Sequence, residues 1–126
     1  MGVNYLIDTN VAIDYINDKL PESIAHVIDN ATLNISVITR MELLVWKSAT
    51  TGHLAIIQNF ISACNVYDLA ELIILEGIHI RKNSGIKLPD AIIAATAIVN
   101  DLTLLTRNTK DFAKVTGLQV TDPWIA

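Results

Sequence analysis

Four acidic residues stand where the sequence predicts strand ends or helix starts. Asp8 directly follows the apolar run of residues 3–7, which is typical of a strand buried in a parallel sheet. An ionised carboxylate at that place needs a cap, a cation or a metal ion as its partner. Glu42, Asp90 and Asp111 follow at intervals along the chain. Brought together, the four carboxylates would suit Mg²⁺ or Mn²⁺, which prefer carboxylate and water oxygens.

Each acid taken alone also has an ordinary structural interpretation. Asp8 can be the N-cap of the next helix, and Thr39 with Glu42 has the form of a capping box. Asp90 suits the first turn of a helix, where the dipole favours a carboxylate, and Asp111 can be a cap or simply solvated. A cluster of all four is different, because without a cation the charges would repel one another.

Strands and helices alternate along the chain, which favours an α/β fold: a single domain, residues 1–126, with a central, mostly parallel sheet of about five strands and helices on both faces. If the second and fourth strands flank the first, the segments that carry the acids open on one edge of the sheet. We predict strands at residues 3–7, 33–38, 65–67, 103–105 and 118–121, and helices at residues 10–16, 21–29, 39–47, 51–63, 70–83, 88–101 and 110–115.

The chain is apolar for its size. Of its 126 residues, 52% are apolar and 17% charged, and the mean hydropathy is +0.43. No stretch approaches the roughly 18 apolar residues of a membrane span, and no secretory signal opens the chain. We therefore expect apolar surface that is covered in a dimer or by a partner.

Charge and cysteine content further limit the class of protein to which the chain can belong. Removing the four candidate acids from the thirteen present leaves nine, which equals the nine Lys and Arg residues, so no dense basic stripe exists. The only cysteine, Cys64, has no disulfide partner and fits a core position in a protein of the reducing cytoplasm. The scattered His26, His53 and His79 give no zinc pattern.

Four segments in this order resemble the signature segments of PIN-domain ribonucleases, and most of all the VapC-type toxins of bacterial toxin–antitoxin pairs. They read L-I-D-T-N, S-V-I-T-R-M-E-L-L, L-P-D-A-I-I-A-A-T-A and L-L-T-R-N-T-K-D-F, and the resemblance spans residues 5–124. It implies a metal-dependent endoribonuclease that hydrolyses RNA phosphodiester bonds with Mg²⁺ or Mn²⁺.

The resemblance also implies roles for individual residues. The metal-binding, catalytic acids fall on Asp8, Glu42, Asp90 and Asp111, and the supporting polar residues fall on Asn10, Thr106 and Asn108. Some similar toxins carry an acid at the position of Asn108, so Asp111 and Asn108 are alternatives for the fourth ligand. The cations nearest the motifs, which we expect to contact RNA, are Arg40, Lys87, Arg107 and Lys110.

Partners are implied in the same way. VapC-type proteins form homodimers and are held inactive by an antitoxin whose C-terminal segment lies in an apolar groove. We expect the apolar helices at residues 10–16, 51–63 and 70–83 to supply these surfaces.

Parts of this pattern are shared with proteins of other functions. A housekeeping PIN nuclease would share the site, and an inert PIN binding module would be expected to lack one of the acids. A phosphatase of the haloacid-dehalogenase type needs a second acid two residues after the first, where this chain has Asn10. A phospho-receiver domain needs an adjacent acidic pair, and no glycine-rich nucleotide loop is present.

Overall fold

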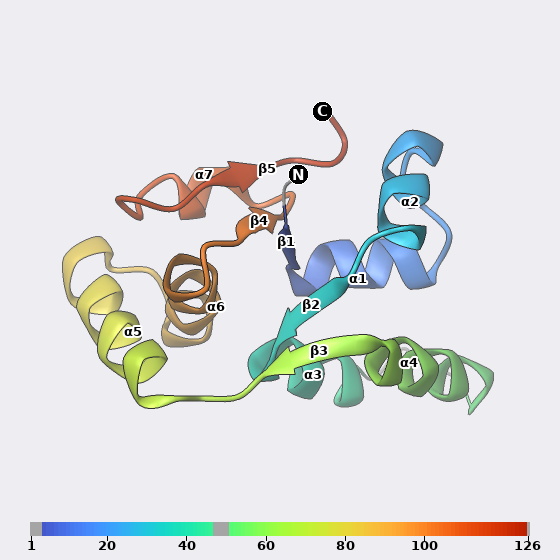
Figure 1. Cartoon of the computed structure of the whole chain (residues 1–126), viewed down its shortest axis with the longest axis horizontal. Coiled ribbons are helices and arrows are strands. Elements are labelled where there is room, and N and C mark those ends of the chain that lie inside the picture. Colours follow the sequence, from blue (N-terminus) through green and yellow to red (C-terminus); the bar gives the residue numbers. More distant parts are fainter. Residues whose placement is uncertain (1–3, 47–50, 126) are drawn as a thin grey trace.

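Short apolar runs form the strands of this protein, and the segments between them form its helices (Figure 1). The computed structural model describes residues 4–46 and 51–125. The strands are β1 (Tyr5–Ile7), β2 (Leu33–Ser36), β3 (Cys64–Tyr67), β4 (Thr103–Leu105) and β5 (Val120–Thr121). The helices are α1 (Thr9–Ile16), α2 (Glu22–Asp29), α3 (Val37–Leu44), α4 (Thr51–Ala63), α5 (Glu71–Ser84), α6 (Leu88–Val99) and α7 (Thr109–Phe112).

The five strands pair in the order β3-β2-β1-β4-β5, and every pair in the described residues is parallel. The predicted α/β fold is confirmed, with an all-parallel sheet where we expected a mostly parallel one. β1 lies between β2 and β4, with Leu6 in register with Asn34 on one side and Leu104 on the other. The carboxyl ends of these three central strands therefore meet at one edge, where parallel sheets bind ligands.

Helices cover both faces of the sheet, as predicted. Leu6 and Ile7 are successive strand residues, so their side chains point to opposite faces. Leu6 belongs to a core shared with α5, α6 and α7, whereas Ile7 belongs to a core shared with α1, α2, α3 and α4. In Figure 1, α5 and α6 lie side by side on one flank, and α2 and α4 lie toward the other.

The predicted second strand is two residues too long, and the helix after it begins two residues earlier than expected. The cause is Ser36, which is the N-cap of α3 and accepts a 3.1 Å hydrogen bond at Oγ from the backbone N–H of Ile38. The β-branched Val37 and Ile38 favour a strand by propensity, but the cap turns them into the first residues of the helix. Val3 and Lys47, the ends of two predicted elements, lie outside the described residues.

Other boundaries differ at the ends of elements. The predicted helices 88–101 and 110–115 end earlier, at Val99 and Phe112, and the predicted strand 118–121 is reduced to Val120–Thr121. Helix α5 ends at a glycine, because Gly85 is its C-cap with a left-handed φ of 74°. Within the ranges that the structure describes, no helix is both long and apolar enough to cross a bilayer.

Candidate active site

Asp8 is a buried residue that directly follows β1 and is the N-cap of α1. Its side chain caps α1 by accepting a 2.9 Å hydrogen bond at Oδ1 from the backbone N–H of Thr9. Its second oxygen, Oδ2, accepts a 2.7 Å bond from the Thr106 hydroxyl and a 3.1 Å bond from the Asn10 amide. The capping interpretation of Asp8 is therefore confirmed, but it accounts for only one of the two oxygens.

The environment of Asp8 disfavours its charged form. Burial raises the pKa of this carboxyl above its ordinary value, the bonds from Thr106 and Thr9 lower it, and the charges of Asp90 and Glu42 raise it further. Only 5% of the residue is exposed. A carboxylate held in this way stands to gain from a nearby cation.

Thr106 and Asn10 join the ends of β4 and β1. The Asn10 amide also donates to Thr106 Oγ1 at 3.2 Å, and its carbonyl oxygen accepts a 3.1 Å bond from the Arg107 backbone. The Asn108 backbone donates to Thr106 Oγ1 at 3.0 Å. Of the three polar residues that the resemblance marked as supporting, Thr106 and Asn10 thus donate to Asp8, and Asn108 is bonded to Thr106.

Glu42 does not form the capping box suggested by its spacing from Thr39. Thr39 is an interior residue of α3, because the helix begins at Val37, and Glu42 consequently lies beyond its first turn. The Glu42 carboxylate instead accepts a 2.7 Å hydrogen bond from the hydroxyl of Thr9, and Thr9 Oγ1 lies 3.0 Å from Thr39 Oγ1. The capping prediction was wrong, and the Glu42 carboxylate is bonded to Thr9, the first residue of α1.

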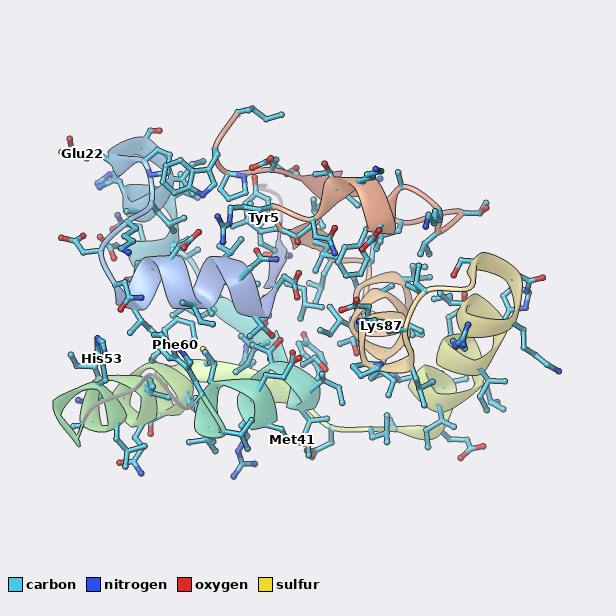
Figure 2. All side chains as sticks on the ribbon, turned by 180° about the vertical axis from the view of Figure 1, so that it is seen from behind. Tyr5, Glu22, Met41, His53, Phe60 and Lys87 are labelled. Atoms are coloured by element: carbon cyan, nitrogen blue, oxygen red, sulfur yellow. The ribbon has the colours of Figure 1, made fainter. Side chains whose placement is uncertain are left out.

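Asp90 lies in the first turn of α6, as predicted. Burial raises the pKa of its carboxyl above the ordinary value, the charges of Glu42 and Asp111 raise it too, and Lys87 lowers it. Figure 2 shows Lys87 near α6, where it is the N-cap residue. Asp90 thus lies within electrostatic reach of two other candidate acids and of one candidate cation.

Asp111 and Asn108 are direct neighbours. The Asn108 amide donates a 3.1 Å hydrogen bond to Asp111 Oδ2, and Asp111 lies in the first turn of α7. Of the two alternatives for the fourth ligand, Asn108 is thus the hydrogen-bond donor and Asp111 the acceptor. Asp111 is also close enough to Asp90 for its charge to raise the pKa of the Asp90 carboxyl.

The candidate RNA-binding cations differ in their surroundings. Arg40 and Lys110 are exposed, and Lys87 interacts with Asp90. The Nε of Arg107 lies 3.0 Å from Oδ2 of Asp14, a carboxylate that the sequence analysis missed. Asp14 stands four residues after Asn10, on the same face of α1, and this spacing was the available signal.

The donor set suits a hard divalent cation. The charges of Asp90 and Glu42 raise the pKa of Asp8, and the charges of Glu42 and Asp111 raise the pKa of Asp90, so the four carboxylates share one region. Within residues 4–46 and 51–125, none of the four forms an ion pair with Lys or Arg, and no three potential ligands converge closely enough to hold one ion as they stand. Oxygen donors of this kind fit Mg²⁺ or Mn²⁺ rather than zinc.

Comparisons with known proteins agree with this geometry. The PIN domain model matches residues 5–118. The chain is 29% identical over 133 residues to the tRNA(fMet)-specific endonuclease VapC of Salmonella typhimurium, covering 95% of this chain and 98% of that protein. The DNA-bound VapBC of Salmonella typhimurium is similar in structure, with a TM-score of 0.84, 27% identity, and coverage of 96% of this chain and 98% of the other.

Two further solved structures are of the same kind. VapBC-1 of nontypeable Haemophilus influenzae has a TM-score of 0.80 and 29% identity, covering 98% of this chain and 100% of the other. A toxin–antitoxin complex of Klebsiella pneumoniae has a TM-score of 0.74 and 33% identity, covering 96% of this chain and 98% of the other. The similarity therefore extends over almost the whole chain in each case.

Proposed function

Because the chain belongs to the PIN domain family, with VapC-like relatives over nearly its full length, we propose that it is a metal-dependent endoribonuclease and the toxin of a VapBC-type pair. The observation that carries the proposal is the group of four acids at the carboxyl edge of the sheet. In that group the charges of Asp90 and Glu42 raise the pKa of the buried Asp8. We place the protein in the cytoplasm, where RNA is available.

We assign the metal-binding, catalytic role to Asp8, Glu42, Asp90 and Asp111, with Mg²⁺ or Mn²⁺ as the ion. Bound there, the ion would supply an activated water for attack on the phosphorus and stabilise charge on the leaving oxygen. Asp8 and Asp90 are the central ligands in this assignment, because both are partly or fully buried and each interacts with Glu42. Glu42 and Asp111 hold the outer positions.

Neighbouring residues keep these acids in place. Thr106 and Asn10 donate to Asp8 Oδ2 and so hold the carboxylate in one orientation, and the bond from Thr106 opposes the rise of its pKa on burial. Thr9 holds Glu42, and Asn108 holds Asp111. Each catalytic acid except Asp90 thus has a side-chain donor from the described residues, which limits the cost of ordering the site when substrate binds.

We propose a structured RNA as the substrate. The Salmonella relative is named for tRNA(fMet), which makes that RNA the first one to test. The near balance of charge outside the acids favours recognition through shape and a few local cations over a broad basic surface.

We propose a VapB-like antitoxin as the partner, since the similar structures are VapBC complexes. A groove of about 450 Å³ suits its apolar segment, and it lies between α1, α2 and α4. Figure 2 shows Phe60, one of its lining residues, between α1 and α4. The other lining residues are Tyr15, Ile16, Asp18, Ala25, Asp29, Leu33, Ile56, Asn59 and Ala63.

We propose a homodimer formed through α5 and α6. Leu72, Leu75, Ile78 and Leu88 are each about half exposed or more, which is unusual for large apolar side chains on two packed helices. An apolar cavity of about 170 Å³ lies between the same helices.

The first experiment is cleavage of total bacterial RNA and of tRNA(fMet) by the purified protein with Mg²⁺, with Mn²⁺ and with EDTA. The control is Asp90→Asn. Cleavage at few sites that requires both the metal and Asp90 supports the proposal. Intact RNA in every lane, together with hydrolysis of a phosphomonoester substrate, would favour the phosphatase alternative.

A second measurement separates a toxin from a housekeeping PIN nuclease. Expression of the chain alone should arrest growth, and co-expression with the small gene found next to its own should restore it. A housekeeping nuclease would be tolerated without any partner.

A further inference from the structure

Asp14 is a buried carboxylate that has no part in the proposed metal chemistry. It lies on α1 and is only 7% exposed. Its Oδ2 atom accepts from Arg107 Nε at 3.0 Å and from Trp124 Nε1 at 3.3 Å. A buried charge is costly unless it is paired and hydrogen-bonded, so Asp14 requires these partners.

Helix α1 holds Arg107 at two points. Asn10 and Asp14 are four residues apart and so lie on one face of the helix. Asn10 accepts from the Arg107 backbone, and Asp14 accepts from its side chain. Asn10 also donates to Asp8, so the residue that fixes Arg107 is itself bonded to a candidate metal ligand.

The guanidinium of Arg107 keeps donors for another group. Arginine has five N–H donors, and the contact with Asp14 is made by Nε. The side chain remains 50% exposed, and the residue directly follows Thr106, the hydrogen-bond donor to Asp8. A cation held next to the four acids can bind a phosphate of a nucleic acid that enters the site. A guanidinium that is already ordered also loses less entropy on binding.

We infer that Asp14 is a positioning residue for RNA: it holds Arg107 through Nε so that the terminal amino groups of the guanidinium contact a phosphate near the cleaved bond. The inference rests on the proposed function and names the part of the same site that grips the substrate. Asp14 touches no substrate and acts through Arg107.

Charge alone predicts the opposite effect of removing Asp14. Loss of one carboxylate reduces repulsion of RNA, so a variant without the charge should bind RNA more tightly. If Asp14 orients Arg107, the same variant should bind more weakly. Asp101→Asn is the matched control, because Asp101 is an exposed residue just after α6 with a φ of 53°, which asparagine tolerates.

The test measures the dissociation constant of labelled tRNA(fMet) by fluorescence anisotropy with Mg²⁺. An Asp90→Asn background keeps the RNA intact. We expect Asp14→Asn to weaken binding about tenfold and Asp101→Asn to leave it unchanged or slightly tighter. We expect Arg107→Ala to weaken binding by a similar factor, and Asp14→Asn to add nothing once Arg107 is alanine. Tighter binding by Asp14→Asn, or independent effects of the two variants, would overturn the inference.

Arg107→Lys gives a second test that does not depend on the folding of Asp14→Asn. A lysine ammonium cannot present a planar fork to Asp14 and to phosphate at once, so we expect binding as weak as with alanine. Binding equal to wild type would contradict the inference. In the parent enzyme, KM should rise more than kcat falls for both Asp14→Asn and Arg107→Lys.

The two levels of the hypothesis fail in different ways. If the wild type cleaves RNA and the variants Asp14→Asn and Arg107→Ala cleave it equally well, only the positioning role is overturned. A wild type that neither binds nor cuts RNA overturns the proposed function and the positioning role together.

Discussion

The hydroxyl of Thr106 donates a 2.7 Å hydrogen bond to Oδ2 of Asp8, although 98 residues separate the two. Thr106 directly follows β4, and Asp8 directly follows β1, its parallel neighbour. This bond opposes the effect of burial on the pKa of Asp8. The pKa of the Asp8 carboxyl therefore depends on a hydrogen bond between residues that follow two neighbouring strands.

Thr106→Val should destabilise the protein mainly where Asp8 is ionised. Valine keeps the shape but removes the donor, which costs about 1–3 kcal/mol for a buried charged acceptor. Burial raises the pKa of Asp8, so its ionisation penalty is absent at low pH and present above that pKa. The loss should be largest at pH 7 and shrink on acidification.

Urea unfolding of the metal-free protein at pH 7 and at low pH measures this. Thr96→Val is the control, because its buried hydroxyl donates to the carbonyl of Ile92 and not to an acid. An equal loss at both pH values for Thr106→Val would contradict the expectation.

Asp90→Asn should abolish RNA cleavage and, without metal, stabilise the fold. Burial and the charges of Glu42 and Asp111 raise the pKa of Asp90, so its ionised form is disfavoured in the folded protein. The penalty exists above the raised pKa and disappears as the pH falls through it. Solvent screening reduces the effect, and we expect a Tm about 2 °C higher at pH 7.

Thermal unfolding in EDTA at pH 7 and near pH 4 tests this, with Asp101→Asn as the control for an exposed acid outside the group. Added Mg²⁺ should raise the Tm of the wild type and not that of Asp90→Asn. A variant that melts lower than wild type at pH 7 in EDTA would count against electrostatic strain among the acids.

Thr9→Val should lower the rate of cleavage while leaving the fold intact. Valine lacks the hydroxyl that donates to the exposed Glu42 carboxylate, so the Glu42 side chain must be ordered during the reaction. We expect kcat to fall about tenfold, which is the scale of an outer-ligand misplacement. Thr9→Ser keeps the hydroxyl and should retain most of the rate; equal losses in the two variants would exclude the hydroxyl as the cause.

Cys64 should not react with thiol reagents in the folded protein. Burial raises the pKa of its thiol to about 12, and its Sγ donates to the carbonyl of Phe60. At pH 8 the reactive thiolate is then on the order of one part in ten thousand. Labelling with a disulfide reagent should be slow in buffer and rapid in urea; rapid labelling of native protein would show that the thiol is accessible.

The sequence predicted the arrangement of this protein better than its details. Alternating strands and helices gave the parallel sheet, and the order of four short segments indicated the acids that the fold brings to one region. The strand end at Ser36 was missed because propensity favoured a strand through Val37 and Ile38, while the cap depends on a single side-chain bond. The same shift removed the expected capping box at Thr39.

Long-range side-chain pairs lay beyond sequence reasoning. Nothing in the chain marks Thr9 as the donor to Glu42, which is 33 residues away, or Trp124 as the donor to Asp14, which is 110 residues away. Such contacts depend on strand order and helix orientation together, and a change of one residue in register would break them.

In the strand order β3-β2-β1-β4-β5, the central strand β1 pairs with β4, so the proposed nuclease site is complete only after β4 has been synthesised. A nascent chain that has emerged only as far as α6 already carries Asp8, Glu42 and Asp90, but it lacks β4, Thr106 and Asp111. Contacts of such high sequence separation form late in folding. The proposed nuclease site would thus be incomplete on the ribosome, and cleavage would begin only once synthesis has passed β4, which leaves time for an antitoxin made first to be waiting.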